Sequence, residues 1–354
     1  MPIPQQFPFP QLAPICFLRY KLKEPFAREG ASLAKRRFAR MRECKWSAIE
    51  VNYRVAVTAR PEFGSTLARM VEKDSTARTR ELGHRMKAFR QRRHFSGADV
   101  SRRNGWLQSK VTRWEQGLRE LSVVDAALYL ATCGEAEPER ELLLELTQSG
   151  NDLYWVRPYF DELVDPTKSL MIQENLAHTV VRYESLTLPA LLQTEPYART
   201  TYELLGNRDQ ARLDQIVNAR MDRQKLLRRD RPPQCRFYVH ERALRSVVGG
   251  PRIMHEQLLH LVLSANLPYC SIRVVPETNE VSRTIENSFT IMEFSEHPAV
   301  VYTDSYAAGM FIDDRVAVEA YYSLVARLES DTLTVENSRQ MLAEWADRYD
   351  RMEE

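Results

Sequence analysis

The sequence lacks the features that mark membrane and secreted proteins. No apolar run among its 354 residues approaches the roughly 18 to 20 residues that a membrane-spanning helix needs. The first residues, MPIPQQFPFPQLAPICF, are rich in proline, and the basic residues follow the apolar part, whereas in a signal peptide they precede it. Together these absences predict a soluble, cytoplasmic protein with no membrane partner.

The sequence is also poor in cysteine and in motifs for catalysis. Its five cysteines are odd in number, widely spaced and without a C-x-x-C pair, which argues against a disulfide framework and a zinc knuckle. No Walker loop, G-x-G-x-x-G or G-x-S-x-G motif occurs. His255 and His260 stand five residues apart, whereas two zinc ligands on one helix face need a spacing of four. We therefore expect no metal, no cofactor and no enzymatic activity.

What the sequence does contain is a strongly uneven distribution of charge. The total formal charge is only +2, but residues 1–69 carry +8, residues 78–121 carry +8 and residues 122–354 carry −13. A short basic module in front of a large acidic body is typical of a nucleic-acid-binding protein with a separate second domain. A solvated basic helix face is the alternative, so charge alone decides little.

Composition divides the chain into three regions. Residues 1–69 are rich in proline and then in arginine, without a sustained helical or strand period. This composition predicts a disordered basic extension, or a wrongly assigned start of translation with Met70 as the true start. The alternative is a basic arm that contacts DNA phosphates. Residues 70–150 are predicted to form a helix-turn-helix DNA-binding domain. Residues 151–354 are predicted to form an α+β domain that binds a partner or an effector.

The DNA-binding domain is predicted to be all-α, with five short helices. In the first, Leu82, Met86 and Phe89 recur at helical spacing. Ser96 and Asp99 have the spacing of a capping box at the start of the second. The third covers 108–116 and ends at Gly117, the fourth follows Ser122 and carries Val124, Leu128 and Leu130, and the fifth runs from about Pro138 to Gln148.

The α+β domain is predicted to contain a small sheet flanked by helices. Residues 150–170, which include Trp155 and two prolines, have the composition of a linker. The predicted helices are 170–183, 195–205, 211–229, 253–264, 315–328 and 335–352. The predicted strands are 235–240, 271–275, 288–294 and 299–305.

Residues 95–120 have the pattern of a helix-turn-helix. Its predicted core consists of Val100, Val111 and Trp114, with Gly105 as the turn residue that tolerates a positive φ. The residues predicted to contact base edges are Gln108, Ser109 and Arg113. The residues predicted to contact phosphates are Lys110, Arg119, Arg93 and Ser96. The basic run 85–93 is expected to lie along phosphates as well, with a solvated face as the alternative.

Residues 107–117, LQSKVTRWEQG, closely resemble the recurrent run of the xenobiotic-response-element family of helix-turn-helix regulators, which have the phage-repressor and Cro-like fold. The resemblance covers about 79–130. It implies that the three predicted base-contacting residues face DNA, while Val111 and Trp114 lie in the core. Gly97, Ser101 and Leu107 depart from the family, which usually has there a glutamine that touches a phosphate, a small alanine and a polar helix cap.

Residues 187–198, TLPALLQTEPYA, and 220–227, RMDRQKLL, resemble signatures of the large domain behind such modules in actinobacterial antitoxin-like transcriptional regulators. The resemblance covers nearly all of 150–350 and implies binding of a small partner protein encoded nearby, not catalysis. The residues of the partner or effector site would be Leu191, Leu192, Gln193, Tyr197, Arg220, Arg223 and Gln224. A packed helix end and a structural salt-bridge set are the alternatives for these residues.

Two functional classes remain open. The chain is a transcriptional repressor or activator that binds operator DNA as a homodimer, or an antitoxin-like protein-binding module whose DNA-binding domain serves autoregulation. A small-molecule-responsive repressor is a third hypothesis, and it would need an apolar cavity in the second domain.

Overall fold

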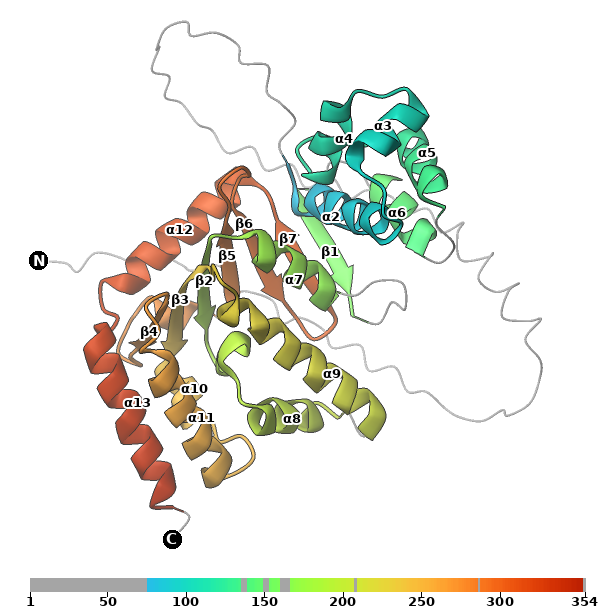
Figure 1. The fold of residues 1–354 in the computed structure, drawn as a ribbon. Coiled ribbons are helices and arrows are strands. Elements are labelled where there is room, and N and C mark those ends of the chain that lie inside the picture. Colours follow the sequence, from blue (N-terminus) through green and yellow to red (C-terminus); the bar gives the residue numbers. More distant parts are fainter. Residues whose placement is uncertain are drawn as a thin grey trace, which may run out of the picture. The chain divides into compact units, whose positions relative to one another are not determined.

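The computed structural model describes residues 75–134, 139–148, 153–159, 166–206, 209–285 and 287–352. The chain divides into two units, 1–66 and 67–354, and the described residues all belong to the second. The predictions for residues 1–69 and for Met70 as the start lie outside the described residues. The described part begins with helices and continues as a domain built on a seven-stranded sheet (Figure 1).

All five helices predicted for the N-terminal domain are present. They are α2 (Ala77–Arg92), α3 (Gly97–Asn104), α4 (Gln108–Glu115), α5 (Val123–Cys133) and α6 (Glu139–Gln148). The predicted capping box is confirmed at α3, where Ser96 and Asp99 satisfy each other's backbone N–H groups. A second capping box, Thr76 with Thr79, begins α2. We call this helical domain the head.

The sheet has the strand order β1-β7-β6-β5-β2-β3-β4. Its strands are β1 (Tyr154–Pro158), β2 (Thr179–Glu184), β3 (Gln234–His240), β4 (Cys270–Val275), β5 (Phe289–Glu293), β6 (Val300–Asp304) and β7 (Ala308–Ile312). Strands β2, β3 and β4 run parallel, and the other neighbouring pairs are antiparallel. The predicted α+β class is confirmed, and the four predicted strands are β3 to β6.

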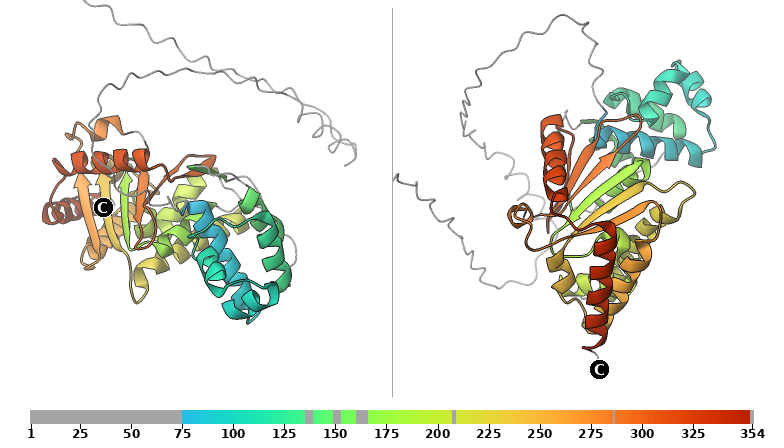
Figure 2. Two further views of the ribbon diagram at one scale, coloured as in Figure 1. Left: turned by 90° about the horizontal axis from the view of Figure 1, so that it is seen from above. Right: turned by 90° about the vertical axis from the view of Figure 1, so that its left-hand side faces the viewer.

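Helices cover both faces of the sheet (Figure 2). One face packs against α12 (Arg315–Glu329), because Val181, Tyr183 and Phe289 share a core with the apolar side of that helix. The other face carries α8 (Glu195–Leu204), α11 (Pro251–Ser264) and α13 (Val335–Asp350), and α9 (Gln210–Arg223) packs against α8. The short helix α10 (Glu241–Arg245) and α7 (Pro166–Leu176) complete the domain. None of the helices in the described ranges has the length and apolarity to cross a membrane.

Three sequence predictions for this domain were wrong. The helix predicted at 170–183 ends at Leu176, and Thr179–Glu184 is strand β2, since both of its edges pair with other strands. The predicted linker contains β1, whose Trp155 is buried and which pairs with β7. The helix predicted at 211–229 changes after Arg223 into a 3-10 helix, Gln224–Arg228. Strand β7 was not predicted.

Candidate nucleic-acid interface

Helix α4, called the reading helix below because its side chains are predicted to contact DNA bases, has one buried and one exposed face. Val111 and Trp114 are almost fully buried, as predicted. The side chains predicted to contact bases, Gln108, Ser109 and Arg113, lie on the exposed part of the same helix. A helix of eight residues that is anchored on one side and polar on the other has the arrangement needed to place side chains in the major groove of DNA.

The turn before α4 is fixed by backbone geometry. Gly105 has φ +67°, the left-handed region that its position requires, and the Trp106 N–H donates to the Ser101 carbonyl at 2.8 Å. The departures from the family pattern are accommodated. The Ser101 hydroxyl donates to the Gly97 carbonyl within its own helix at 2.7 Å. Leu107 is the residue before α4, 76% exposed, and makes no side-chain cap.

The predicted phosphate contact Lys110 lies in an aromatic setting. Trp106 and Trp114 meet edge to face with ring centroids 5.0 Å apart. The Lys110 ammonium lies 4.6 Å from the Trp114 centroid and 5.3 Å from that of Trp106, and 3.4 Å from an Asp125 carboxylate oxygen. These contacts hold the cation beside the start of α5, next to the reading helix.

The other residues predicted to contact phosphates differ in whether their side chains already make hydrogen bonds within the protein. Arg119 is exposed. The Arg93 guanidinium donates to the Gly134 carbonyl at 2.8 Å, and the Ser96 hydroxyl is used in the capping box of α3. Within the basic run, Arg90 turns inward and bonds both oxygens of Glu115, at 2.7 and 2.6 Å. The run 85–93 is therefore partly structural. Arg102, which is exposed near the turn, was not among the predicted contacts.

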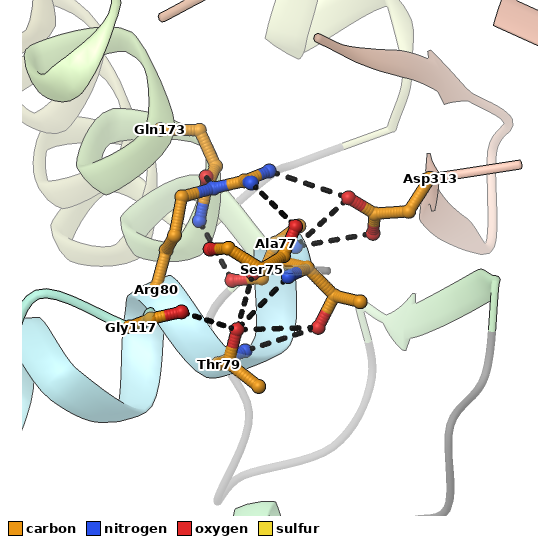
Figure 3. Close-up of polar contacts among 8 residues, drawn as sticks. Ser75, Ala77, Thr79, Arg80, Gly117, Gln173 and Asp313 are labelled. Atoms are coloured by element: carbon orange, nitrogen blue, oxygen red, sulfur yellow. Dashed lines mark hydrogen bonds and ion pairs between the residues drawn. The ribbon is translucent and has the colours of Figure 1, made fainter. Parts of the chain in front are cut away.

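A buried polar cluster joins the first turn of α2 to the sheet domain (Figure 3). The Arg80 side chain is 0% exposed. Its Nε donates to Gln173 Oε1 of α7 at 2.8 Å, and its Nη2 lies 3.3 Å from Asp313 Oδ1, just after β7. Both Asp313 oxygens also accept from the Ala77 N–H at 3.1 Å. Gln173 returns a bond to the Ala77 carbonyl at 2.8 Å. We call these residues, Ala77, Arg80, Gln173 and Asp313, the joint.

Burial dominates the electrostatics of the joint. It lowers the pKa of Arg80 to about 10, although Asp313 acts in the opposite direction. Burial likewise raises the pKa of Asp313, against the effect of Arg80. Both directions mean that the loss of hydration outweighs the attraction between the two groups, so each charge depends on its partner to remain buried.

The end of the reading helix rests on the same turn of α2. Gly117 has φ +70°, and a Cβ there would lie 2.6 Å from the Arg80 Cα. Its carbonyl accepts from the Thr79 hydroxyl at 3.1 Å (Figure 3). One turn further along α2, a Cβ on Gly83 would lie 2.7 Å from the Glu115 carbonyl oxygen. The backbones of α2 and of the end of α4 therefore touch directly, which connects the reading helix to the joint.

His297 lies next to the joint, and its lowered pKa predicts that stability depends on pH. Burial, and secondly the charge of Arg80, lower the pKa of His297 from 6.5 to about 4. The unfolded chain therefore binds more protons than the folded chain between these two values, and stability is lost as the pH falls through this window. Between about pH 7 and about pH 4.5, the free energy of unfolding of His297→Gln should therefore fall by roughly 1–3 kcal/mol less than that of the parent.

The measurement is urea unfolding of both proteins at the two pH values. Burial also lowers the pKa of His84, His240 and His260, so the parent should still lose stability in acid, and the difference between parent and variant isolates His297. Equal pH dependence of the two proteins would contradict the prediction.

The residues predicted for a partner or effector site form one packed cluster on the sheet domain. Leu191, Leu192 and Tyr197 are almost fully buried. Arg223 bonds both oxygens of Glu174 at 2.6 Å. The remaining polar members bond mostly to one another and to nearby backbone: Gln224 to the Gln193 and Ala190 carbonyls, Gln193 to the Leu188 carbonyl, and Arg220 to Gln193 and Tyr202. The structure thus brings Gln193, Arg220 and Gln224 together by hydrogen bonds, whereas Arg223 pairs with Glu174 outside the predicted set.

The sequence did not predict the joint. An arginine near a helix start is normally solvated, so nothing in the pattern around Arg80 indicates burial. Its acidic partner Asp313 is 233 residues away in the sequence. Residues 76–81, polar except for Ala77, are all buried in the structure, although such a composition normally predicts an exposed turn.

Comparison with known protein families gives two matches. Residues 81–143 match the family model of a helix-turn-helix domain, which makes the chain a DNA-binding regulator. Residues 167–344 match the model of a domain of unknown function, DUF5753. No protein with curated annotation and no solved structure matches the chain. Because the second match spans half of the sequence, the chain belongs to the family defined by DUF5753, with a DNA-binding helix-turn-helix domain in front of it.

Proposed function

We propose that the protein is a sequence-specific transcriptional regulator of the xenobiotic-response-element type, which acts on operator DNA in the bacterial cytoplasm. Gln108, Ser109 and Arg113 would contact base edges. Lys110, Arg119, Arg93 and Ser96 would contact phosphates. The observation that carries the proposal is the two-faced helix α4, with Val111 and Trp114 buried and the three polar side chains exposed. The charge of +8 on residues 78–121 supports it, because phosphates attract such a surface.

The test compares two substitutions on the same helix. A guanidinium can donate two hydrogen bonds to a guanine edge, so Arg113→Ala should cost about 1–3 kcal/mol and relax specificity at one base pair per half-site. A phosphate contact carries no sequence information. Lys110→Ala should therefore weaken binding to all sequences alike and reduce the salt slope by about one.

Fluorescence anisotropy on the operator and on random duplexes, at several salt concentrations, measures both effects. The operator itself is first obtained by selection from a random DNA pool. If Arg113→Ala binds the selected operator as tightly and as selectively as the parent, then α4 is not the reading helix.

We also propose that the regulator binds DNA as a homodimer. A reading helix of eight residues reaches only a few base pairs, and a two-fold pair of heads would read two half-sites about one helical turn apart. The selected operator should then be an inverted repeat. Sedimentation of the complex should give two chains per duplex, and one chain on an asymmetric site would contradict the dimer.

We further propose that the sheet domain binds a small partner protein encoded beside the regulator, as its resemblance to antitoxin-like regulators implies. Its charge supports a protein partner, since residues 151–354 carry −8 and would be repelled by DNA. The proposed contact region is the cluster around Gln193, Arg220 and Gln224. Coexpression of the full chain with the neighbouring small gene product, followed by pull-down, tests the idea. Recovery of the regulator without that product would contradict it.

A further inference from the structure

A cleft of about 400 Å³ lies between the head and the sheet domain, in the same compact unit. Its walls come from α2, α6 and α7. The buried side chains Phe89, Leu142 and Leu143 contribute apolar surface from the head, and Met171 and Ile172 of α7 face them. This volume lies within the range of about 300–1,000 Å³ that holds small ligands, and its lining is largely apolar, as such sites are.

The polar part of the lining is cationic. Arg85, Arg92 and Lys168 line the cleft, and the described residues that line it include no aspartate or glutamate. Arg85 is partly neutralised from behind, because its Nε lies 2.7 Å from Glu81 Oε1. Burial, followed by the charges of Arg85 and Lys87, lowers the pKa of His84, which leaves this histidine neutral at pH 7. An apolar cleft with a positive rim is complementary to an amphipathic anion.

We propose that this cleft binds a small apolar carboxylic acid, and that its occupancy changes the affinity for DNA. The proposed effect on DNA affinity rests on the proposed regulatory function. Helix α7 supplies Met171 and Ile172 to the cleft. The next residue of the same helix, Gln173, belongs to the joint. Helix α2 supplies Phe89 to the cleft and Arg80 to the joint, and the end of the reading helix touches Arg80 through Gly117. A ligand between α2 and α7 thus acts on the two helices that the joint connects.

The binding site is tested on the full chain by isothermal calorimetry with three ligands of equal chain length: decanoate, decan-1-ol and decylamine. Decanoate should bind at least about tenfold more tightly than either of the others, because only its carboxylate pairs with the cationic rim. Equal affinities of the three ligands would overturn the assignment of an anion site. No binding of decanoate would overturn the site itself.

Two variants localise the binding. Ala88→Trp fills the cleft from α2 and should abolish binding of decanoate, while Lys168→Gln should weaken it by about fivefold or more. Lys225→Gln is the matched control, because it removes an exposed lysine of the same domain outside the cleft. Circular dichroism verifies that each variant is folded. Undiminished binding in both folded cleft variants, or the same loss in Lys225→Gln, would overturn the placement of the ligand.

The regulatory half is tested by anisotropy on the selected operator with and without saturating decanoate. The dissociation constant for DNA should change by at least about fivefold, and the change should be lost in Ala88→Trp. Binding of decanoate with an unchanged affinity for DNA would overturn the coupling and leave the site standing. Failure of the parent to bind any DNA would overturn the proposed function instead, while calorimetry still decides the site.

Discussion

Replacement of Trp114 by alanine should lower the free energy of unfolding by about 3–5 kcal/mol and abolish DNA binding. The indole is 2% exposed and packs edge to face on Trp106. Its Nε1–H donates to the Glu120 carbonyl at 3.2 Å, and its ring carries the Lys110 ammonium. Truncation therefore opens a cavity in the core of the head, leaves a carbonyl without its donor and releases a predicted phosphate contact. Urea unfolding, monitored by circular dichroism, measures the decrease in the free energy of unfolding.

Two controls separate folding from contact with DNA. Trp114→Phe keeps an aromatic ring and should cost clearly less, since it loses mainly the hydrogen bond and part of the volume. Arg113→Ala should lose specificity at unchanged stability, because its side chain is exposed. A Trp114→Ala protein that unfolds at the urea concentration of the parent would show that this side chain does not hold the head together.

Replacement of Asp313 by alanine should also lower the free energy of unfolding by about 3–5 kcal/mol, for a different reason. The substitution leaves the guanidinium of Arg80 buried without its carboxylate and removes both acceptors of the Ala77 N–H. A buried charge that loses its partner retains the full cost of its lost hydration. Urea unfolding at neutral pH measures the effect.

The adjacent Asp314 provides a matched control. It caps α12 by accepting from the Ala317 N–H at 2.8 Å, so Asp314→Ala should cost only about 1 kcal/mol. The double variant Arg80→Met with Asp313→Leu replaces the ion pair with apolar side chains, and it should be more stable than Asp313→Ala alone. A loss in Asp313→Ala no larger than in Asp314→Ala would refute the importance of the joint.

The head could be predicted almost completely because its signals are local. The pair Ser96 and Asp99, the glycine at 105 and the spacing of Val111 and Trp114 each act within a few residues, and the structure contains what they predict. The base-contacting and phosphate-contacting roles stay predictions. The spacing of residues places their side chains on exposed helix faces. It does not show that Arg90 turns inward to Glu115, a residue of a different helix.

The sheet domain was harder to predict because its decisive contacts are distant in the sequence. Strand β2 follows α7 after two residues, and Val180, Val181 and Tyr183 continue an apolar pattern that a helix also shows. Pairing with β3 and β5 makes it a strand, and those partners begin more than 50 residues later. Strand β1 is short, ends in proline and lies at the edge of the sheet, so its composition resembles that of a loop.

The direct contact of the α2 and α4 backbones at Gly83 and Gly117 bears on how such a regulator diverges after gene duplication. A side chain at either glycine would push the reading helix away from α2, so both positions tolerate almost no change. Gln108 and Ser109 lie outside this contact, with exposed side chains. If these two side chains contact bases, as proposed, substitutions there would change the operator of a duplicated copy while the head keeps its fold. Substitution of either glycine would instead displace the reading helix and abolish DNA binding by the copy.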